Sequence, residues 1–389
     1  MKVLVFGMGL MGPAVAKDCA EAPEVKKVTG CDVDKSKLNS AKKYVSSDKF
    51  DTASVDITDK GALVKKMRGY DVVINCTAAR FSMGVLEAAA EAKVNVVDLA
   101  GGGYPQEGEI YGRVKEAGIT AIPGCGVDPG LIDILSGQAM SMMDEVDDVM
   151  FACGGLPKDP KPPLDYKIVF GGTKMPVRPG KVPMIVDGKM VEVDRYSEVE
   201  SLYVEGLEPM EAFVDGFASS LLKLSLERGA KNFRGKTVRY SGYVDKITFL
   251  NDLGLISEEP VDYEGTPVVP RELFHKVIYP LVRFDTEAGD RDLTVLLVRV
   301  EGRKGGLDLK VNYDMVDEFD EKTHTTSMAK TTGYTAAIVA RMLGRGAIKE
   351  RGIQWPVRVI RGPLFEELLR SLRERGVEVT ETVTYTREV

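Results

Sequence analysis

The first 126 residues alternate short apolar runs with longer segments whose apolar positions recur at helical spacing. The apolar runs predict six strands, at Lys2–Phe6, Val28–Cys31, Ala53–Val55, Val72–Asn75, Val94–Asp98 and Thr120–Ile122. The segments between them predict helices, among them Met11–Glu21, Lys35–Val45, Met83–Ala92 and Glu107–Ala117. This alternation is typical of an α/β domain with a doubly wound parallel sheet, and we predict such a domain over residues 1–126.

The pattern changes after the crossover Gly126–Gly130, where strands with one apolar face replace the β-α alternation. Leu307–Val316 is apolar at alternate positions, and a polar turn joins it to the apolar Leu293–Val300, so the two predict a hairpin. Asp187-Gly188 predicts a second hairpin. We therefore expect residues 127–325 to form a mixed, largely antiparallel α+β domain.

The last part of the chain, residues 326–389, is predicted to be a helical segment. Its two helical stretches are Met328–Leu343 and Pro363–Arg375. An isolated helix pair would leave its apolar stripe in water, so we expect it to pack on the first domain or on the domain junction.

A glycine-rich turn, Gly7-Met-Gly9-Leu-Met-Gly12, joins the first strand to the first helix. In a dinucleotide site Gly7 permits the tight turn, Gly9 lets the backbone approach a pyrophosphate, and Gly12 lets helix and strand pack closely. Asp32 follows the second strand, where an acid can accept both ribose hydroxyls of NAD. The alternative to a dinucleotide site is that these glycines are needed only for the packing of the turn.

The other predicted cofactor residues follow the carboxyl ends of strands, where doubly wound sheets bind their ligands. They are Leu10, Met11, Val33, Asp56, Ile57, Asn75, Cys76, Thr77, Ala78, Asp98 and Leu99. The alternative for each of these residues is that it lies in a solvated loop and does not contact the cofactor.

Composition narrows the range of partners. A length of 389 residues favours two domains, and a net charge of −7 without a Lys/Arg block argues against nucleic acid or an anionic membrane. We expect a soluble, cytoplasmic protein with small ligands, because there is neither an N-terminal signal peptide nor a run of eighteen apolar residues. The five scattered cysteines predict free thiols and no metal site.

Two places carry candidate catalytic chemistry. Asp128 follows the sixth strand, beside the expected nicotinamide, although it could also be the N-cap of a helix starting near Leu131. Arg239, in a predicted strand, could bind a substrate carboxylate with its two-pronged guanidinium. Tyr240 is a catalytic candidate that a regular strand would place on the opposite face, so at most one of the two is expected in a flat site.

Hydroxyl and imidazole groups are the remaining candidates. Ser219 and Ser220 precede a helical run and could bind a carboxylate or cap the helix. The only two histidines, His275 in an apparent helix and His324 in a polar turn, are weaker candidates. Oxidation of a 2-hydroxy acid normally needs a base whose pKa lies near 7, whereas oxidation of an amine can proceed with a carboxylate and a phenol.

Several of these motifs together resemble one known family. The glycine turn, Asp32, the crossover with Asp128-Pro-Gly, the strand Thr237–Gly242 and the run Met328–Tyr334 occur in the order found in the saccharopine dehydrogenase-like family, of which the lysine 6-dehydrogenases are the nearest members. The resemblance implies a Rossmann domain joined to a catalytic and dimerisation domain in a homo-oligomer. It also implies NAD-dependent oxidation of the side-chain amine of L-lysine. The first alternative is oxidation of a secondary amine in a saccharopine-type opine. The second is a sensor that binds NAD without catalytic turnover.

Overall fold

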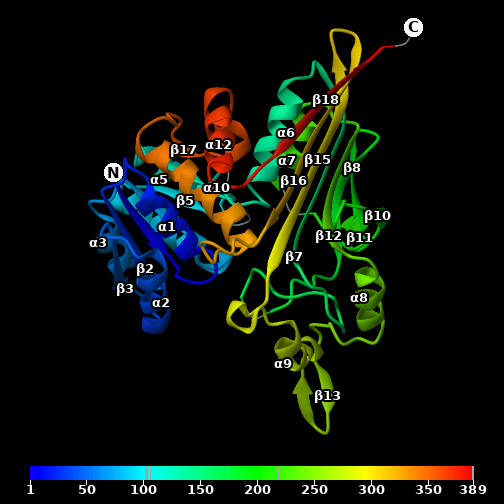
Figure 1. Cartoon of the computed structure of the whole chain (residues 1–389), viewed down its shortest axis with the longest axis horizontal. Helices are drawn as coiled ribbons and strands as arrows, with labels where there is room; N and C mark the ends of the chain where they lie inside the picture. Colours follow the sequence, from blue (N-terminus) through cyan, green and yellow to red (C-terminus); the bar gives the residue numbers. More distant parts are fainter. Residues whose placement is uncertain (101–103, 106, 173, 217–218, 388–389) are drawn as a thin grey trace. The chain divides into compact units, whose positions relative to one another are not determined.

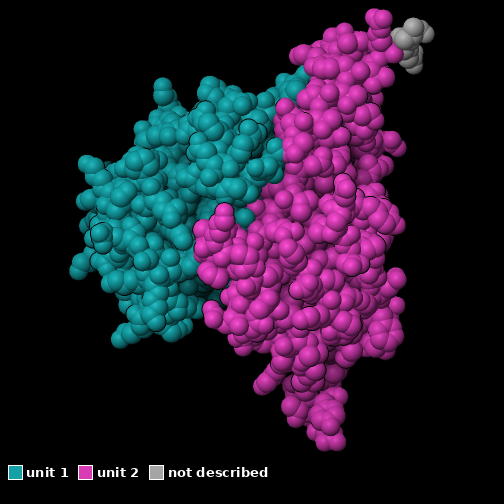
Figure 2. Space-filling model, in the orientation of Figure 1, with its two compact units in different colours: residues 1–142, 218–224, 328–379 teal, residues 143–217, 225–327, 380–389 magenta. Residues whose placement is uncertain are grey.

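The computed structural model describes residues 1–387 except 101–103, 106, 173 and 217–218 (Figure 1). Two compact units, coloured separately in Figure 2, account for the chain. The first comprises Met1–Met142, Ala218–Leu224 and Met328–Val379, and the second comprises Met143–Phe217, Ser225–Ser327 and Thr380–Val389. This division differs from the predicted boundary at residue 126, because the helix after the crossover belongs to the first unit.

A parallel sheet forms the centre of the first unit. Within the described residues it has seven strands in the order β17-β6-β5-β4-β1-β2-β3. Their bounds are β1 Lys2–Phe6, β2 Lys27–Asp32, β3 Phe50–Ser54, β4 Val72–Asn75, β5 Asn95–Asp98, β6 Thr120–Ile122 and β17 Gly352–Ile353. The order 3-2-1-4-5-6 is that of the Rossmann fold, so the predicted fold class and its six strands are confirmed. The short edge strand β17, far along the chain, was not predicted.

Helices cover both faces of this sheet. They are α1 Gly12–Glu21, α2 Lys35–Val45, α3 Lys60–Met67, α4 Ser82–Ala92, α5 Glu109–Glu116 and α6 Leu131–Ser141. Leu4 and Phe6 of β1 pack in one core with apolar residues of α3, α4 and α5. Because neighbouring strand residues alternate, Val3 and Val5, which are fully buried, point to the opposite face.

The C-terminal helices pack on the first unit. They are α10 Ser327–Gly344, α11 Pro356–Val359 and α12 Pro363–Arg373. A Cβ on Gly333 of α10 would lie 3.2 Å from the Val15 side chain of α1, so the two helices approach closely there. Asp18 of α1 is buried and forms ion pairs with Arg341 and Arg375. These pairs fix the returning segment to the helix that follows the glycine turn.

The second unit is built on a mixed sheet. Its described residues form nine strands, with the path β10-β11-β12-β7-β15-β16-β18 and with β8 pairing β12 and β9. The bounds are β7 Glu145–Pro157, β8 Lys181–Val186, β9 Lys189–Asp194, β10 Glu200–Leu202, β11 Met210–Val214, β12 Asn232–Tyr240, β15 Asp292–Lys304, β16 Leu307–Glu318 and β18 Thr380–Thr386. Strands β7 and β12 are parallel, whereas their other pairings are antiparallel. Both predicted hairpins are present, as β8–β9 and as the long β15–β16 pair visible in Figure 1.

Two segments differ from the predictions. Met210–Val214 is the strand β11, which was not predicted, and Thr380–Thr386 is a strand paired with β16 rather than part of a helical segment. Threonine, valine and tyrosine dominate the latter strand, and these residues favour strands. The rest of the unit contains α8 Tyr243–Asp252, α9 Pro270–Val282 and a small hairpin of β13 Val261–Tyr263 and β14 Thr266–Val268. Helix α7, Ser219–Glu227, belongs to the first unit up to Leu224. Within the described part of the chain, no helix has the length and apolarity needed to cross a membrane.

Candidate active site

The three glycines of the β1–α1 turn are required for different reasons. Gly7 has φ +89°, and a Cβ on Gly12 would lie 1.8 Å from the Gly7 carbonyl oxygen, so the protein's own packing demands both. A Cβ on Gly9 would meet no described atom within 4 Å. The packing of the described residues therefore does not require a glycine at position 9. The turn thus fits a pyrophosphate that approaches the backbone at Gly9, in front of the N-terminus of α1.

Asp32 is held in place at the end of β2. Its Oδ2 accepts a hydrogen bond from Met8 N at 2.9 Å, and its Oδ1 accepts one from Asp34 N at 3.0 Å. The carboxylate is therefore fixed beside the glycine turn while remaining partly exposed. Val33, next to it, is 60% exposed, so the end of β2 is open to a ribose.

The remaining predicted cofactor residues lie after strand ends, with differing exposure. Gly9, Leu10, Val33, Asp56 and Ala78 are exposed, whereas Met11, Ile57, Cys76, Thr77 and Leu99 are half-buried. The Asp56 carboxylate accepts hydrogen bonds from the backbone and hydroxyl of Thr58, and these lower its pKa. Asp56 thus stabilises its own loop.

Asn75 and Asp98 form a buried pair between the ends of β4 and β5. Asn75 Nδ2 donates to Asp98 Oδ2 at 2.8 Å, and its Oδ1 accepts from the Thr77 hydroxyl at 2.7 Å. Tyr104 also donates to Asp98, at 3.1 Å. Both predicted side chains therefore hold the loops after β4 and β5 in position. Burial raises the pKa of Asp98 to about 6, despite hydrogen bonds from Asn75 and from the Ala100 amide that lower it.

This raised pKa predicts a pH dependence of stability. The native state holds a proton on Asp98 that the unfolded chain releases, so this contribution to stability is full below about pH 4 and is lost as pH rises through 6. The difference between this pKa of about 6 and the ordinary value of 3.8 corresponds to about 3 kcal/mol in the free energy of unfolding. We expect Asp98→Asn to gain up to that free energy of unfolding relative to the wild type between pH 4 and 7, measured by urea unfolding. The exposed Asp48→Asn is the control, and identical pH profiles of wild type and Asp98→Asn would contradict the assignment.

The crossover that carries Asp128 lies at the same edge of the sheet. Cys125 N donates to Asp98 O at 2.9 Å and Gly124 N donates to Ala100 O at 2.9 Å, so the loop after β6 is bonded to the loop after β5. A Cβ on Gly130 would lie 2.3 Å from Gly126 O, which shows how tight the turn is. Asp128 is half-buried within this turn.

The N-cap alternative for Asp128 is wrong. Gly130 is the N-cap of α6, and Asp133 accepts a hydrogen bond from the Gly130 amide at 2.8 Å. Asp133 also accepts one from the Ser220 hydroxyl at 2.6 Å, and burial raises the pKa of its carboxyl. The predicted substrate residue Ser220 is thus bonded to a buried acid of the first unit. The side chain of Ser219 lies outside the described part of the structure.

Arg239 lies on β12 of the second unit and is buried. Its guanidinium lies over the rings of Tyr166 and Tyr243, at 4.7 and 5.6 Å from their centroids. Nη1 donates to the carbonyl of Val238 at 2.7 Å, and Nε has no hydrogen-bond partner among the described residues. A buried donor without a partner is costly, so this nitrogen suits an acceptor supplied by a ligand.

Two further arginines, Arg178 and Arg195, pair with the buried Asp215, which follows β11. Asp215 accepts hydrogen bonds from Arg178 at 2.6 Å, from the Thr237 hydroxyl at 3.0 Å, and from Arg195. Thr237 and Arg239 are two residues apart on β12 and share a face. Sequence reasoning missed this group because its members come from separate segments.

Tyr240 points to the other face of β12, as a regular strand requires. Its hydroxyl donates to the carbonyl of Pro157 at 2.7 Å, within an apolar core that includes Val238 and Leu293. Burial, followed by Asp159 and Glu208, raises the pKa of Tyr240 to about 12. The hydrogen bond gives this phenol a structural role.

The two histidines lie on other elements, His275 in α9 and His324 in the turn after β16. His275 is buried in α9, and neither of its ring nitrogens has a hydrogen-bond partner among the described residues. Burial first, and then Arg271 and Lys174, lower the pKa of His275, which favours the neutral form of the ring. The His324 ring packs edge-on against Phe319.

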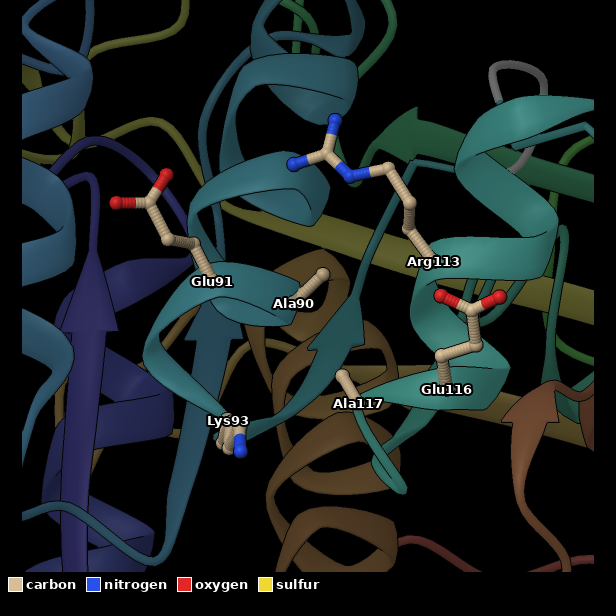
Figure 3. A pocket seen from close by; sticks show the side chains of 6 residues that line it. All are labelled: Ala90, Glu91, Lys93, Arg113, Glu116 and Ala117. Atoms are coloured by element: carbon tan, nitrogen blue, oxygen red, sulfur yellow. The ribbon is translucent and has the colours of Figure 1, made fainter.

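A surface pocket of about 280 Å³ lies elsewhere on the first unit (Figure 3). Ala90, Glu91 and Lys93 at the end of α4 face Arg113, Glu116 and Ala117 of α5 across it. Both helices end there before their strands begin, so the pocket lies at the edge opposite to the glycine turn. Its mixed charges suit no single class of ligand.

The first unit is thus a dinucleotide-binding module, and the second presents a buried cationic group. Two family models match the chain, the saccharopine dehydrogenase NADP binding domain over residues 3–122 and the saccharopine dehydrogenase C-terminal domain over residues 126–377. The chain belongs to the saccharopine dehydrogenase family of NAD(P)-dependent oxidoreductases.

Curated relatives and a solved structure agree with this membership. The chain is 27% identical to a saccharopine dehydrogenase [NADP(+), L-glutamate-forming] of Saccharomyces cerevisiae, covering 69% of this chain and 62% of the relative, less than two thirds of its length. It is 23% identical to a carboxyaminopropylagmatine dehydrogenase of Synechocystis, covering 90% of this chain and 91% of the relative. The fold matches apo saccharopine dehydrogenase of Saccharomyces cerevisiae with a TM-score of 0.80 at 20% identity, over 98% of this chain and 99% of the other.

Proposed function

We propose that the protein is an NAD-dependent dehydrogenase that oxidises a secondary amine in an opine-type substrate bearing a carboxylate. The observation that carries this proposal is the buried Arg239 guanidinium, whose Nε has no acceptor among the residues that the structure describes. The names of two relatives, which concern saccharopine and carboxyaminopropylagmatine, support a secondary amine over the primary side-chain amine of lysine.

The proposed reaction breaks a C–H bond and then a C–N bond. A bound nicotinamide supplies the hydride acceptor. The carbon loses hydride while the nitrogen lone pair forms C=N, and water then adds and divides the product into a carbonyl compound and a primary amine. One oxidised nicotinamide and one water are consumed, and one proton is released. An ammonium has no free lone pair, so we assign to Asp128 the removal of the amine proton.

The proposed coenzyme is NAD rather than NADP. A 2′-phosphate would meet the fixed carboxylate of Asp32, whose two oxygens are oriented by the amides of Met8 and Asp34. The family model is named for NADP, so this preference would distinguish the chain from relatives that use the phosphorylated coenzyme. Lys35 and Lys37, which follow in sequence, soften the repulsion without removing it.

A substrate panel tests the proposal. The appearance of NADH absorbance is measured with saccharopine, carboxyalkyl derivatives of polyamines, L-lysine and cadaverine at equal concentrations. We expect turnover with one or more of the secondary amines and little with lysine. Lysine as the best substrate would replace the secondary-amine proposal with side-chain deamination, and NADH binding without turnover of any amine would indicate a sensor.

Arg239→Lys is expected to keep the positive charge of this residue and to lose the guanidinium group that can donate two parallel hydrogen bonds to one carboxylate. Loss of one charged hydrogen bond costs about 1.5 to 3 kcal/mol, so kcat/KM for a carboxylate-bearing amine should fall roughly tenfold or more. The same amine without its carboxylate should be a poor substrate and should react equally well with both enzymes. Equal losses with the two substrates would show that Arg239 maintains the fold rather than binding a carboxylate.

Asp128→Asn is expected to lower kcat by about a hundredfold or more, since positioned acid-base groups contribute at least that factor. NADH affinity, measured by fluorescence titration, should change little because the glycine turn and Asp32 are unaltered. Turnover at the wild-type rate would remove Asp128 from the mechanism.

A further inference from the structure

The strand β18 forms one border of the mixed sheet in the second unit. It lies beside β16 (Figure 1), and among the described residues its backbone pairs with β16 alone. All of its residues are exposed. The outer row of backbone N–H and C=O groups on such an edge strand is a template for the pairing of a further strand.

β18 lacks the features that usually protect an edge strand. Proteins keep such strands short, place charged residues or proline on them, or interrupt them with a bulge. The edge strand β10 has 3 residues, and the edge strand β9 carries Lys189, Glu192 and Asp194. β18 has 7 residues with neither lysine nor proline, and its register with β16 is unbroken from Thr380 to Thr386. Its outer edge is therefore open to another strand.

One face of β18 continues the buried face of the sheet. Val383 and Tyr385 pair with Val311 and Leu309 of β16, so the four side chains lie on the same face. Val311 and Leu309 are fully buried, whereas Val383 and Tyr385 are 37% and 55% exposed. A strand added outside β18 would cover apolar surface as well as satisfy backbone groups.

The sequence of β18 is complementary to itself. If two copies pair antiparallel about a two-fold axis at Val383, this valine lies opposite its counterpart, Thr382 lies opposite Thr384, and Glu381 lies opposite Tyr385. Opposed threonines can form hydrogen bonds, and no like charges oppose each other in this register. About one backbone hydrogen bond per paired residue would form, which lies within the range of about 10 ± 5 for a specific interface.

We propose that β18 is a self-association surface, and that two copies of this chain pair through it into one continuous sheet. Both copies use the same edge, so the interface is isologous and the assembly closes as a dimer. This inference does not rest on the proposed function. It concerns a surface of the second unit that lies outside the candidate active site.

Charge substitutions at the axis test the pairing, with sedimentation of the whole protein as the measurement. We expect the wild type to be a dimer at micromolar concentration. Val383→Lys places two like charges opposite each other and should raise the dissociation constant of the dimer at least about a hundredfold, and Val383→Glu should do the same. An equimolar mixture of the two variants should recover the dimer, because unlike charges then oppose each other. Val277→Lys, at a 67% exposed valine of α9, is the matched control and should remain a dimer.

Cysteine substitutions test the register without adding charge. In a dimer of the Val383→Cys variant the two Cα atoms at the axis should lie about 4.5 to 5.5 Å apart, which a disulfide can bridge. Tyr385→Cys is the control on the same face, because its counterpart lies four residues further along the paired strand, about 14 Å away. We expect oxidation to link the chains of the first variant but not those of the second, measured by non-reducing electrophoresis with the wild type as background.

Several results would overturn the proposal. A monomeric wild type would leave the edge to some other extended segment. A dimer that persists in Val383→Lys, or that dissociates in Val277→Lys instead, would place the interface elsewhere. Equal cross-linking of the two cysteine variants would exclude the antiparallel register about Val383. Circular dichroism checks that each variant folds, and if Val383→Lys does not, the cysteine variants decide.

Discussion

The wild-type protein should use NAD⁺ with a kcat/KM at least about a hundredfold higher than that for NADP⁺. A phosphate placed about 4 Å from a fixed carboxylate meets a repulsion of order 4 kcal/mol at an effective dielectric of 20, and mobile lysines reduce that figure. Asp32 cannot turn away at no cost, because each of its oxygens accepts a backbone amide. The coenzyme preference should therefore be large.

Asp32→Ser should shift the preference toward NADP⁺ by at least about tenfold, since the variant removes the charge and makes room for a phosphate. Asp51→Ser, which removes an exposed acid from the neighbouring strand β3, is the matched control and should keep the wild-type ratio. The measurement is the ratio of kcat/KM for the two coenzymes in each variant. Equal use of NAD⁺ and NADP⁺ by the wild type would show that Asp32 does not contact the ribose.

The elements of the first unit could be predicted because their signals are local. An apolar run of four or five residues, a glycine turn and a helical spacing each lie within a short window of sequence. The N-cap Asp34 shows the same principle, since it accepts amides only two and three residues ahead. The edge strand β17 has no such signal: two residues, Gly352 and Ile353, pair with β6 only because the chain returns there.

Site residues could be predicted where their contacts are local in sequence. They could not be predicted where charged side chains from separate segments come into contact. Arg239 was a candidate from its strand, but its partners Tyr166 and Tyr243 lie on other segments. Asp215 gathers Arg178 and Arg195 from positions 37 and 20 residues away. Asp133 was missed because Gly130, the N-cap of α6, has no side chain, so the usual capping-box pattern is absent and only the bond from the Gly130 amide to Asp133 forms.

The second and third glycines of the turn, Gly9 and Gly12, should respond differently to substitution. Gly9→Val should fold normally, since a Cβ there meets no described atom within 4 Å, but its side chain would occupy the space that a pyrophosphate needs. Loss of even one or two charged hydrogen bonds to phosphate should weaken NADH binding about ten- to a hundredfold or more. Gly12→Ala should weaken both fold and binding, because its Cβ would lie 1.8 Å from the Gly7 carbonyl.

Calorimetry and NADH titration on the same preparations distinguish the two effects. Overpacking of this severity costs roughly 3 kcal/mol, so Gly12→Ala should unfold several degrees below the wild type, whereas Gly9→Val should unfold at the wild-type temperature. Gly84→Ala, on α4 with no described atom within 4 Å of its Cβ, is the control for a harmless glycine replacement. If Gly9→Val bound NADH as tightly as the wild type, the open space at this glycine would not be the pyrophosphate site, and the assignment of the turn would fail with it.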